Sequence, residues 1–181
     1  MWLTHAKNGN TLAFNHIVEK YRHSVYNLCY RMLKNADEAE DAVQEVFTRA
    51  YFKLDSYKDT DKFSTWLFSI ASHYCIDRLR KRHFQLIPWD DLASWGRWSI
   101  QETPQPERVL IEAEAVEEIQ ALLNSLPPDY RMAIILKYWQ AMSYQEIAET
   151  LKTTVSAVKS KLFRARKMMA ASVILEPQTV P

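Results

Sequence analysis

The side chains best suited to chemistry lie near the C-terminal end of the chain, between Lys152 and Lys167. This stretch holds six Lys or Arg residues and no acid, although the net charge of the 181-residue chain is only +1. Such a concentration of basic groups favours an anionic partner such as a nucleic acid. Hydroxyl and guanidinium groups can read base edges, lysines can neutralise phosphates, and an aromatic ring can touch a thymine methyl group.

Helical spacing divides this stretch into two faces. Steps of three and four residues place one apolar stripe on a helix from the capping residue Thr154 to about Ala170, made of Val155, Val158, Leu162, Ala165 and Met169. At 3.6 residues per turn, the opposite face carries Ser156, Ser160, Phe163, Arg164 and Lys167, flanked by Lys159, Lys161 and Arg166. Phe163 is the informative residue, because a merely solvated face has no reason to carry an aromatic ring.

A shorter helix is predicted just before this one. Ser143 with Glu146 three residues later is the pattern of a capping box, and Ile147 and Leu151 supply a buried side. Two short helices, of which the second is basic, predict a helix-turn-helix whose second helix enters the major groove of DNA. The glycine that usually occupies the turn is missing.

An acidic segment lies in the N-terminal half, with five acids from Asp37 to Glu45. Asn35 is suited to cap a helix here, with Glu38 three residues on as in a capping box. Spacing predicts a buried stripe of Ala39, Val43, Val46 and Ala50, and an opposite face with Asp41, Gln44, Glu45 and Thr48. The pattern alone fits either a solvated face or a surface that docks on a protein.

The following helix, predicted from about Phe63 to Arg82, is apolar nearly all round in its first half and strongly basic at its end. Basic residues suit a helix C-terminus because of the helix dipole. Four Lys or Arg residues among the five positions from 78 to 82 exceed that need. The excess indicates a second contact with a nucleic-acid backbone.

These groups must be positioned by helices, because the chain has only two glycines and an all-β fold needs many tight turns. We therefore predict an all-α fold of two small helical domains, residues 1–83 and 108–181. A linker of residues 84–107 joins them, where proline, glycine and irregular spacing interrupt the helical pattern. Trp89, Trp95 and Trp98 in the linker either dock on a domain or await a partner.

Several classes of protein are disfavoured by the sequence. The two cysteines, Cys29 and Cys75, are predicted to be core residues, and without a CxxC pair no zinc site is expected. The histidines are scattered and no HExxH, GxSxG or P-loop motif occurs, so we expect neither an enzyme nor a cofactor or metal. Met1 to Asn10 lacks a signal-peptide pattern, and no apolar run is long enough to span a membrane, so a cytoplasmic protein is expected.

Four sequence blocks carry a specific resemblance. They read AFNHIVEKYRHSVYNLCYRML and ADEAEDAVQEVFTRAY, then KFSTWLFSIASHYCIDRLRKR, and finally LPPDYRMAIILKYWQAMSYQEIAETLKTTVSAVKSKLFRARKMM. In this order and spacing they resemble the extracytoplasmic-function (ECF) sigma factors, the smallest class of the sigma-70 family of bacterial RNA polymerase. The match extends from about Leu12 to Ala170.

The resemblance implies a sigma-2 domain, a linker directed toward the RNA exit channel, and a sigma-4 domain. Such factors bind core RNA polymerase, direct it to promoter DNA, take no small-molecule substrate, and commonly serve stress or envelope responses. By analogy an anti-sigma factor is expected as a partner, and such a partner can hold the protein at the membrane. The acidic helix, with Asp41, Gln44, Glu45 and Thr48, resembles the surface that docks on the clamp helices of the largest polymerase subunit.

Two sets of DNA-binding residues follow from the resemblance. For the −10 element the implied residues are Lys58, Asp59, Lys62, Phe63, Ser64, His73, Arg78, Arg80 and Lys81, whereas Trp66 is expected to be structural. For the −35 element they are Tyr144, Gln145, Ser156, Lys159, Ser160, Lys161, Phe163, Arg164 and Lys167. At position 73 the family usually has asparagine, so this histidine either alters the −10 base pocket or is a core residue.

The alternative function is a stand-alone helix-turn-helix regulator. Such a regulator would need neither the acidic helix nor the basic-ended helix that follows it. Binding of the first part of the chain to core polymerase is the measurement that separates the two functions.

Overall fold

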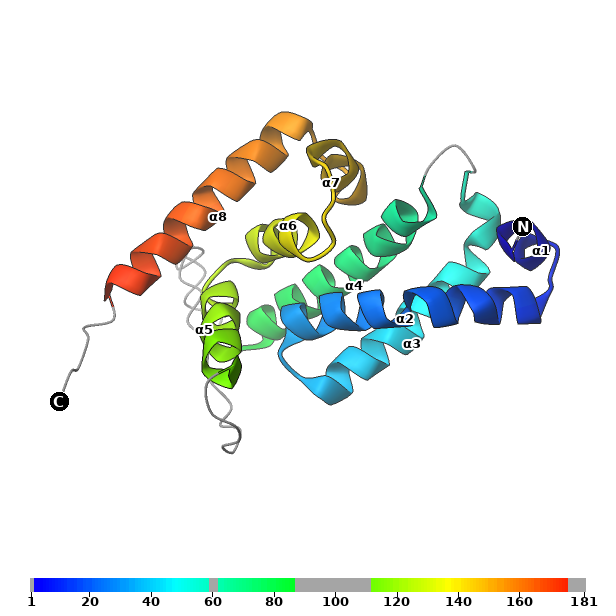
Figure 1. Cartoon of the computed structure of the whole chain (residues 1–181), viewed down its shortest axis with the longest axis horizontal. Helices are drawn as coiled ribbons and strands as arrows, with labels where there is room; N and C mark the ends of the chain where they lie inside the picture. The colour runs from blue at the N-terminus through cyan, green and yellow to red at the C-terminus, as the bar shows by residue number, and fades with distance from the viewer. Residues whose placement is uncertain (1, 59–61, 87–111, 176–181) are drawn as a thin grey trace.

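The computed structural model describes residues 2–58, 62–86 and 112–175. Within these ranges the chain forms eight α-helices, one short 3₁₀ turn and no strand, which confirms the predicted all-α fold (Figure 1). No helix in the described ranges is both long and apolar enough to cross a membrane. Four residues that the sequence singles out, Asp59, Trp89, Trp95 and Trp98, lie outside the described residues.

The N-terminal half contains four α-helices, α1 (Trp2–Lys7), α2 (Thr11–Leu33), α3 (Ala36–Phe52) and α4 (Phe63–Leu86), and a 3₁₀ turn η1 (Leu54–Ser56). Asn10 caps α2 by accepting a hydrogen bond from the Ala13 N–H, and Asn35 caps α3 in the same way from Glu38, at 2.9 Å. Helices α2, α3 and α4 pack against one another in pairs. Helix α1 was not foreseen, and α4 continues to Leu86, past its predicted end.

The core of the N-terminal half agrees with the predicted periodicity. The α3 stripe of Ala39, Val43, Val46 and Ala50 is buried, and so are Leu67 and Ala71 of α4. Cys29 of α2 and Cys75 of α4 are both free and fully buried, as predicted for core residues. A hydrogen bond with Cys29, together with burial, raises the pKa of the Cys75 thiol well above its usual value.

The C-terminal half consists of α5 (Glu112–Asn124), α6 (Pro128–Tyr138), α7 (Tyr144–Thr150) and α8 (Val155–Leu175). Proline at the first position of α6 suits a helix start, because its missing N–H would have no partner there. Helix α8 packs on α5, α6 and α7. It lies along the outer edge of the molecule, away from α2 and α3 (Figure 1).

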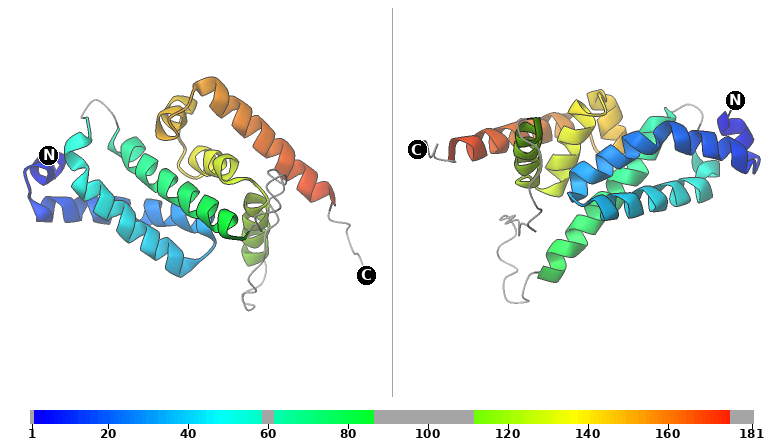
Figure 2. Two further views of the ribbon diagram at one scale, coloured as in Figure 1. Left: turned by 180° about the vertical axis from the view of Figure 1, so that it is seen from behind. Right: turned by 60° about the horizontal axis from the view of Figure 1, so that its bottom comes forward.

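The two halves are in direct contact. Helix α4 packs against α6 and α7, and α2 packs against α5 and α6. In Figure 1 and in the left view of Figure 2, α4 runs between α3 and the C-terminal helices α6 and α7. The sequence predicts two domains but contains no signal for how, or whether, they touch, and the boundaries at 83 and 108 stay a prediction.

Candidate nucleic-acid interface

Both helices of the helix-turn-helix begin at the predicted residues, whereas α8 continues to Leu175, past its predicted end near Ala170. Ser143 accepts a hydrogen bond from the Glu146 N–H, and the Glu146 carboxylate accepts one from the Ser143 N–H at 2.7 Å, which completes the capping box. Thr154 caps α8 by accepting a hydrogen bond from the Ala157 N–H at 3.1 Å. Lys152 takes the left-handed conformation in the turn, with φ of 51°, where the more usual residue is glycine.

Helix α8 presents the face that the periodicity predicts. Val158, Leu162 and Ala165 are buried, with Val155 and Met169 partly buried. The side chains on the opposite face are exposed, namely Ser156, Lys159, Ser160, Phe163, Arg164 and Lys167, while Lys161 is half-buried. Phe163 is 63% exposed, so its ring is free to make a contact. This face can offer hydroxyl, guanidinium, ammonium and aromatic groups to a groove of DNA.

Tyr144, at the start of α7, links this face to α6. Its ring lies 4.7 Å from the Lys137 ammonium and 6.0 Å from that of Lys159, measured from the ring centroid. Cation–π contacts of this kind hold two positive charges beside one phenol ring. Gln145 is exposed and donates a hydrogen bond to Glu149. Lys137 was not predicted as a site residue, because its contact with Tyr144 depends on how α6 and α7 pack.

The start of α4, implied in −10 recognition, is built on aromatic packing. The Phe63 ring lies 5.3 to 5.4 Å from those of Tyr21, Tyr57 and Trp66, and only 6% of the residue is exposed. Phe63 therefore supports the neighbouring loop and does not present its ring to a ligand. Trp66 belongs to the same cluster, as expected for a structural residue. Around this cluster, Lys58 and Lys62 are exposed and Ser64 is half-buried.

His73 is half-buried on α4, and its Nδ1 lies 2.6 Å from the carbonyl oxygen of Ser69. Because a carbonyl oxygen only accepts, Nδ1 must carry a proton and donate it. In the neutral ring Nε2 is then an acceptor. Asparagine, the residue that the family resemblance implies here, has both a donor and an acceptor in its amide group, so the two side chains are not equivalent at this position.

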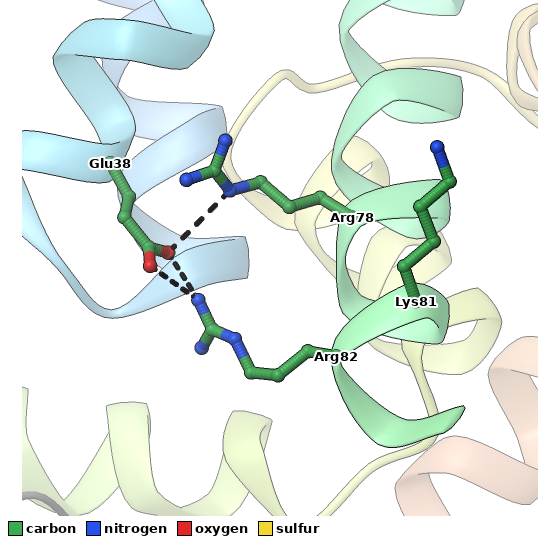
Figure 3. Close-up of a pocket in the computed structure, with 4 residues that line it drawn as sticks. All are labelled: Glu38, Arg78, Lys81 and Arg82. Atoms are coloured by element: carbon green, nitrogen blue, oxygen red, sulfur yellow. Dashed lines mark hydrogen bonds and ion pairs between the residues drawn. The ribbon is translucent and has the colours of Figure 1, made fainter. Parts of the chain in front are cut away.

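The basic end of α4 is partly neutralised by one acid of α3. The Glu38 carboxylate accepts hydrogen bonds from Arg82, at 2.6 Å to Oε1, and pairs with Arg78 Nε at 3.9 Å (Figure 3). With Lys81 these residues line an open hollow of about 250 Å³. The Glu38 side chain therefore binds arginines of α4, whereas the sequence suggested that it would complete a capping box with Asn35. Three cations around one carboxylate leave a net positive surface.

Two further cations of the −10 set are paired with acids of the C-terminal half. Lys62 Nζ lies 2.6 Å from Glu146 Oε1, and Arg80 Nη2 lies 2.7 Å from Asp129 Oδ2. The hydrogen bond from Lys62, followed by those from Ser143, lowers the pKa of Glu146 from 4.5 to about 2. Glu146 therefore serves two structures at once, the capping box of α7 and a bridge to α4.

The outer face of α3 carries the predicted docking residues together. Asp41, Gln44 and Thr48 are exposed and Glu45 is half-buried. Glu45 accepts a hydrogen bond from Arg49 at 2.6 Å, and the Thr48 hydroxyl donates one to the Gln44 carbonyl oxygen. Arg49 also lies over the ring of Tyr74 in α4, 5.1 Å from the ring centroid. The face can offer carboxylates and an amide to a basic protein surface.

The predicted site residues lie on the outer face of α8, on the outer face of α3 and on two sides of α4. Lys62 and Arg80 meet the C-terminal half, whereas Arg78 and Lys81 lie beside Glu38 of α3. Among the described residues, no group of three or more His, Cys, Asp and Glu side chains is placed to hold a metal ion. The outer face of α8 is exposed to solvent, while the side of α4 with Lys62 and Arg80 is in contact with α6 and α7.

Models of known families match both halves of the chain. Residues 17–85 match Sigma-70 region 2, and residues 116–169 match Sigma-70, region 4. The first segment contains α3 and α4 up to residue 85, and the second contains the helix-turn-helix.

Curated relatives are similar over most of their length. The chain is 38% identical over 169 residues to ECF RNA polymerase sigma factor SigW of Bacillus subtilis, covering 90% of each chain. It is 34% identical to ECF RNA polymerase sigma-E factor of Escherichia coli, covering 89% of this chain and 86% of that one. Identity to RNA polymerase sigma-H factor of Pseudomonas aeruginosa is 30%, with the same coverage.

Two solved structures share the fold. One is CnrH in complex with the cytosolic domain of CnrY, with a TM-score of 0.69, 22% identity and 97% of each chain covered. The other is the sigma factor RpoE of Bartonella quintana in complex with the anti-sigma factor NepR. Its TM-score is 0.67 at 24% identity, covering 91% of this chain and 98% of that one. At these identities the likeness concerns the fold.

Proposed function

We propose that this chain, which belongs to the ECF group of sigma-70 family RNA polymerase sigma factors, carries out promoter recognition through three separate surfaces. The α8 face reads the −35 element, the start and the basic end of α4 bind the −10 region, and the outer face of α3 docks on the clamp helices of core polymerase. The family membership disfavours a stand-alone DNA-binding regulator.

The exposed face of α8 is the observation that supports −35 reading most directly. Its hydroxyls, Phe163 and Arg164 project from a helix whose opposite side is fully packed, so they are free to enter a major groove. Tyr144, with Lys137 and Lys159 over its ring, gives positive charge at the start of α7 for the flanking phosphates. In this proposal α8 reads the bases, and the adjacent helix α7 contacts the phosphates of the DNA backbone.

Binding to the −10 region is assigned to α4 and the residues just before it, because Arg78, Arg80, Lys81 and His73 share that helix and Lys58 and Lys62 precede it. Lys58, Lys62, Arg78, Arg80 and Lys81 supply phosphate contacts, and His73 offers one acceptor to a base edge. The buried Phe63 acts by holding the preceding loop. Ser64, half-buried beside it, is within this loop-to-helix junction.

The docking role of α3 can be tested on the full chain. Changing Asp41→Lys and Glu45→Lys reverses two charges on an outer helix face and leaves the buried stripe intact. We expect affinity for core polymerase to fall at least tenfold, the order measured for close charge pairs at interfaces, and promoter-directed transcription to fall with it. Affinity is measured by a fluorescence-anisotropy titration with core polymerase.

A matched control is Glu117→Lys with Glu118→Lys, which makes the same charge change on the exposed side of α5. Helical circular dichroism reports whether either variant loses structure. Equal affinity of the α3 variant and the control for core polymerase would show that the docking surface lies elsewhere.

Regulation by an anti-sigma factor is part of the proposal. Solved relatives in fold are bound to the cytosolic domain of CnrY or to the anti-sigma factor NepR. We infer that a comparable protein holds this factor inactive in the bacterial cytoplasm, at the membrane if that partner is anchored there, until a stress or envelope signal releases it. Affinity purification of the tagged chain before and after envelope stress tests this, and a set of bound proteins that is the same in both states contradicts it.

A further inference from the structure

Helix α1 is folded back onto the start of α2 by the turn between them. Gly9 has φ of 83°, a conformation that glycine adopts without strain. Its N–H donates to the Ala6 carbonyl at 3.0 Å, and the Asn10 N–H donates to the His5 carbonyl at 3.1 Å. These two hydrogen bonds form a Schellman motif, which ends a helix and reverses the chain. The turn packs α1 against α2, and none of the site residues proposed above lies in this helix.

The last residue of α1 reaches the segment that follows η1. Lys7 Nζ donates a hydrogen bond to the Tyr57 carbonyl oxygen at 2.8 Å, across 50 positions of sequence. The same ammonium lies 5.1 Å from the centroid of the Tyr57 ring, within the range of a cation–π contact. Helix α1 also packs against η1. One side chain thus holds both the backbone and the ring of Tyr57.

Tyr57 belongs to the aromatic cluster at the start of α4. Only 5% of it is exposed, and its ring lies 5.3 Å from that of Phe63 and 5.5 Å from that of Trp66. Lys58 comes directly after Tyr57 and is exposed. Lys62 comes directly before Phe63 and is exposed too. The cluster therefore sets where both of these cations of the proposed −10 surface stand.

We propose that α1 positions the −10 site, and that Lys7 is a positioning residue which acts through Tyr57. The inference rests on the −10 role proposed above. A segment that is held in place before DNA arrives loses less conformational entropy when it binds, so the contact from Lys7 strengthens −10 binding. Lys7 is half-buried and its ammonium is engaged by Tyr57, so it acts without itself touching DNA.

Three variants of the full chain separate a positioning role from a loss of charge. Lys7→Met removes the ammonium and keeps an unbranched apolar side chain. Lys7→Arg keeps a charged donor and should restore most of the contact. The matched control is Lys53→Met, which removes one positive charge from an exposed position just before η1.

Positioning of Tyr57 is measured without DNA, by amide hydrogen exchange. The Tyr57 N–H donates to the Leu54 carbonyl at 3.1 Å, so its exchange rate reports local opening of this turn. We expect exchange to be about fivefold faster in Lys7→Met, the order of one net hydrogen bond, and unchanged in Lys53→Met. An unchanged rate in Lys7→Met would overturn the assignment of Lys7 as the residue that holds Tyr57.

DNA binding is measured with holoenzyme assembled from core polymerase and each variant. Selection from a random duplex library by the unmodified holoenzyme supplies its preferred −10 and −35 sequences. The −10 ratio is then the dissociation constant for a duplex with a scrambled −10 sequence divided by that for the intact duplex, and the −35 ratio is defined likewise. We expect Lys7→Met to lower the −10 ratio about fivefold and to leave the −35 ratio unchanged. Lys53→Met should change neither ratio.

Four outcomes would overturn the positioning role. They are an unchanged −10 ratio in Lys7→Met, an equal fall in Lys53→Met, a fall of both ratios together, and a loss in Lys7→Arg as large as that in Lys7→Met. The second would assign the effect to charge alone, and the third to general destabilisation. Failure of the proposed −10 role itself would appear elsewhere, in an unmodified holoenzyme whose selected DNA shows no −10 preference.

Discussion

At the scale of single residues, exposure separates the side chains that can meet DNA from those that position them. Phe63 and Phe163 both belong to sites implied by sequence, yet Phe63 is 6% exposed and Phe163 is 63% exposed. The first ring is enclosed by Tyr21, Tyr57 and Trp66, so it stabilises a loop. The second ring is exposed to solvent and is free to make a contact.

Arg164 is expected to read a base because it lies beside Phe163 on the exposed face of α8. Truncation in Arg164→Ala should weaken binding to a promoter with its preferred −35 sequence by about 1–3 kcal/mol and relax selectivity at one position. Binding of polymerase holoenzyme to duplexes with single-base changes measures this. Lys161→Ala, at the flank, should weaken all duplexes alike, and the same uniform pattern for Arg164→Ala would assign Arg164 to a phosphate.

Glu146 gives a pH-dependent prediction. Its pKa is lowered to about 2 by the hydrogen bonds from Lys62 and Ser143. A lowered carboxylate pKa adds stability that is present above the ordinary value near 4.5 and is lost as pH falls through about 2. The bridge and the capping box should therefore survive to about pH 3.

Removing the lysine in Lys62→Ala should raise the pKa of Glu146 but leave it below 4.5, because the Ser143 N–H still donates. Nuclear magnetic resonance titration of the Glu146 side-chain carboxyl carbon measures the value. Lys58→Ala removes a lysine charge that is not a cause of this shift, and should leave the pKa of Glu146 where it is. If the pKa of Glu146 is also unchanged in Lys62→Ala, the bridge between Lys62 and Glu146 does not form in solution.

At the scale of the helices, capping residues decide where the elements begin. Asn35, Ser143 and Thr154 each accept the expected N–H, and the helices start within one residue of them. The ends of helices are less well marked, since α4 and α8 both run past their predicted ends to Leu86 and Leu175. Few glycines occur in this chain to mark a helix end.

The turn between α7 and α8 has a residue under backbone strain. Lys152 has φ of 51°, a conformation that costs a residue other than glycine about 1–2 kcal/mol. Lys152→Gly removes that cost but adds about 0.5–1 kcal/mol of chain entropy in the unfolded state. We expect the free energy of unfolding to rise by about 0.5 kcal/mol, measured by urea denaturation. Lys152→Ala removes the same charge without relieving the backbone, so equal stability of the two variants would contradict the explanation by strain.

At the scale of the whole molecule, Arg131 connects the two halves. It is 6% exposed, and burial lowers its pKa to about 10, so it stays charged at neutral pH. Its guanidinium donates to the carbonyls of Met32, Asn124 and Leu126. One side chain therefore caps the ends of α2 and α5 together, and a planar group with several donors is needed to do this.

Truncation of this residue in Arg131→Met should lower the free energy of unfolding by about 2–4 kcal/mol, because buried carbonyls lose their donors. Arg131→Lys keeps the charge but cannot reach three carbonyls at once. Its free energy of unfolding should therefore lie between those of the unmodified chain and Arg131→Met. Thermal and urea denaturation measure both variants. A loss below about 0.5 kcal/mol for Arg131→Met, the range of ordinary surface changes, would show that the halves do not share this cap.

Much of the architecture could be predicted from the sequence because it depends on local chemistry. The α8 stripe of Val158, Leu162 and Ala165 follows from the helical repeat, and Thr154 and Ser143 from the geometry of N-caps. The exposed set with Phe163 and Arg164 follows as the other side of the same helix. Periodicity states which face is buried but not what buries it.

Tertiary structure alone decided the contacts between distant residues. Lys62 meets Glu146, 84 positions away, and Arg131 meets Met32, 99 positions away. No repeat or capping signal relates such pairs, because their distance is set by how α4 and α2 pack against α6 and α7. The sequence by itself determined the helices, the faces of α3 and α8, and the family. Only the packing of the two halves decided that α6 and α7 lie against α4, because that depends on which helices share a buried surface.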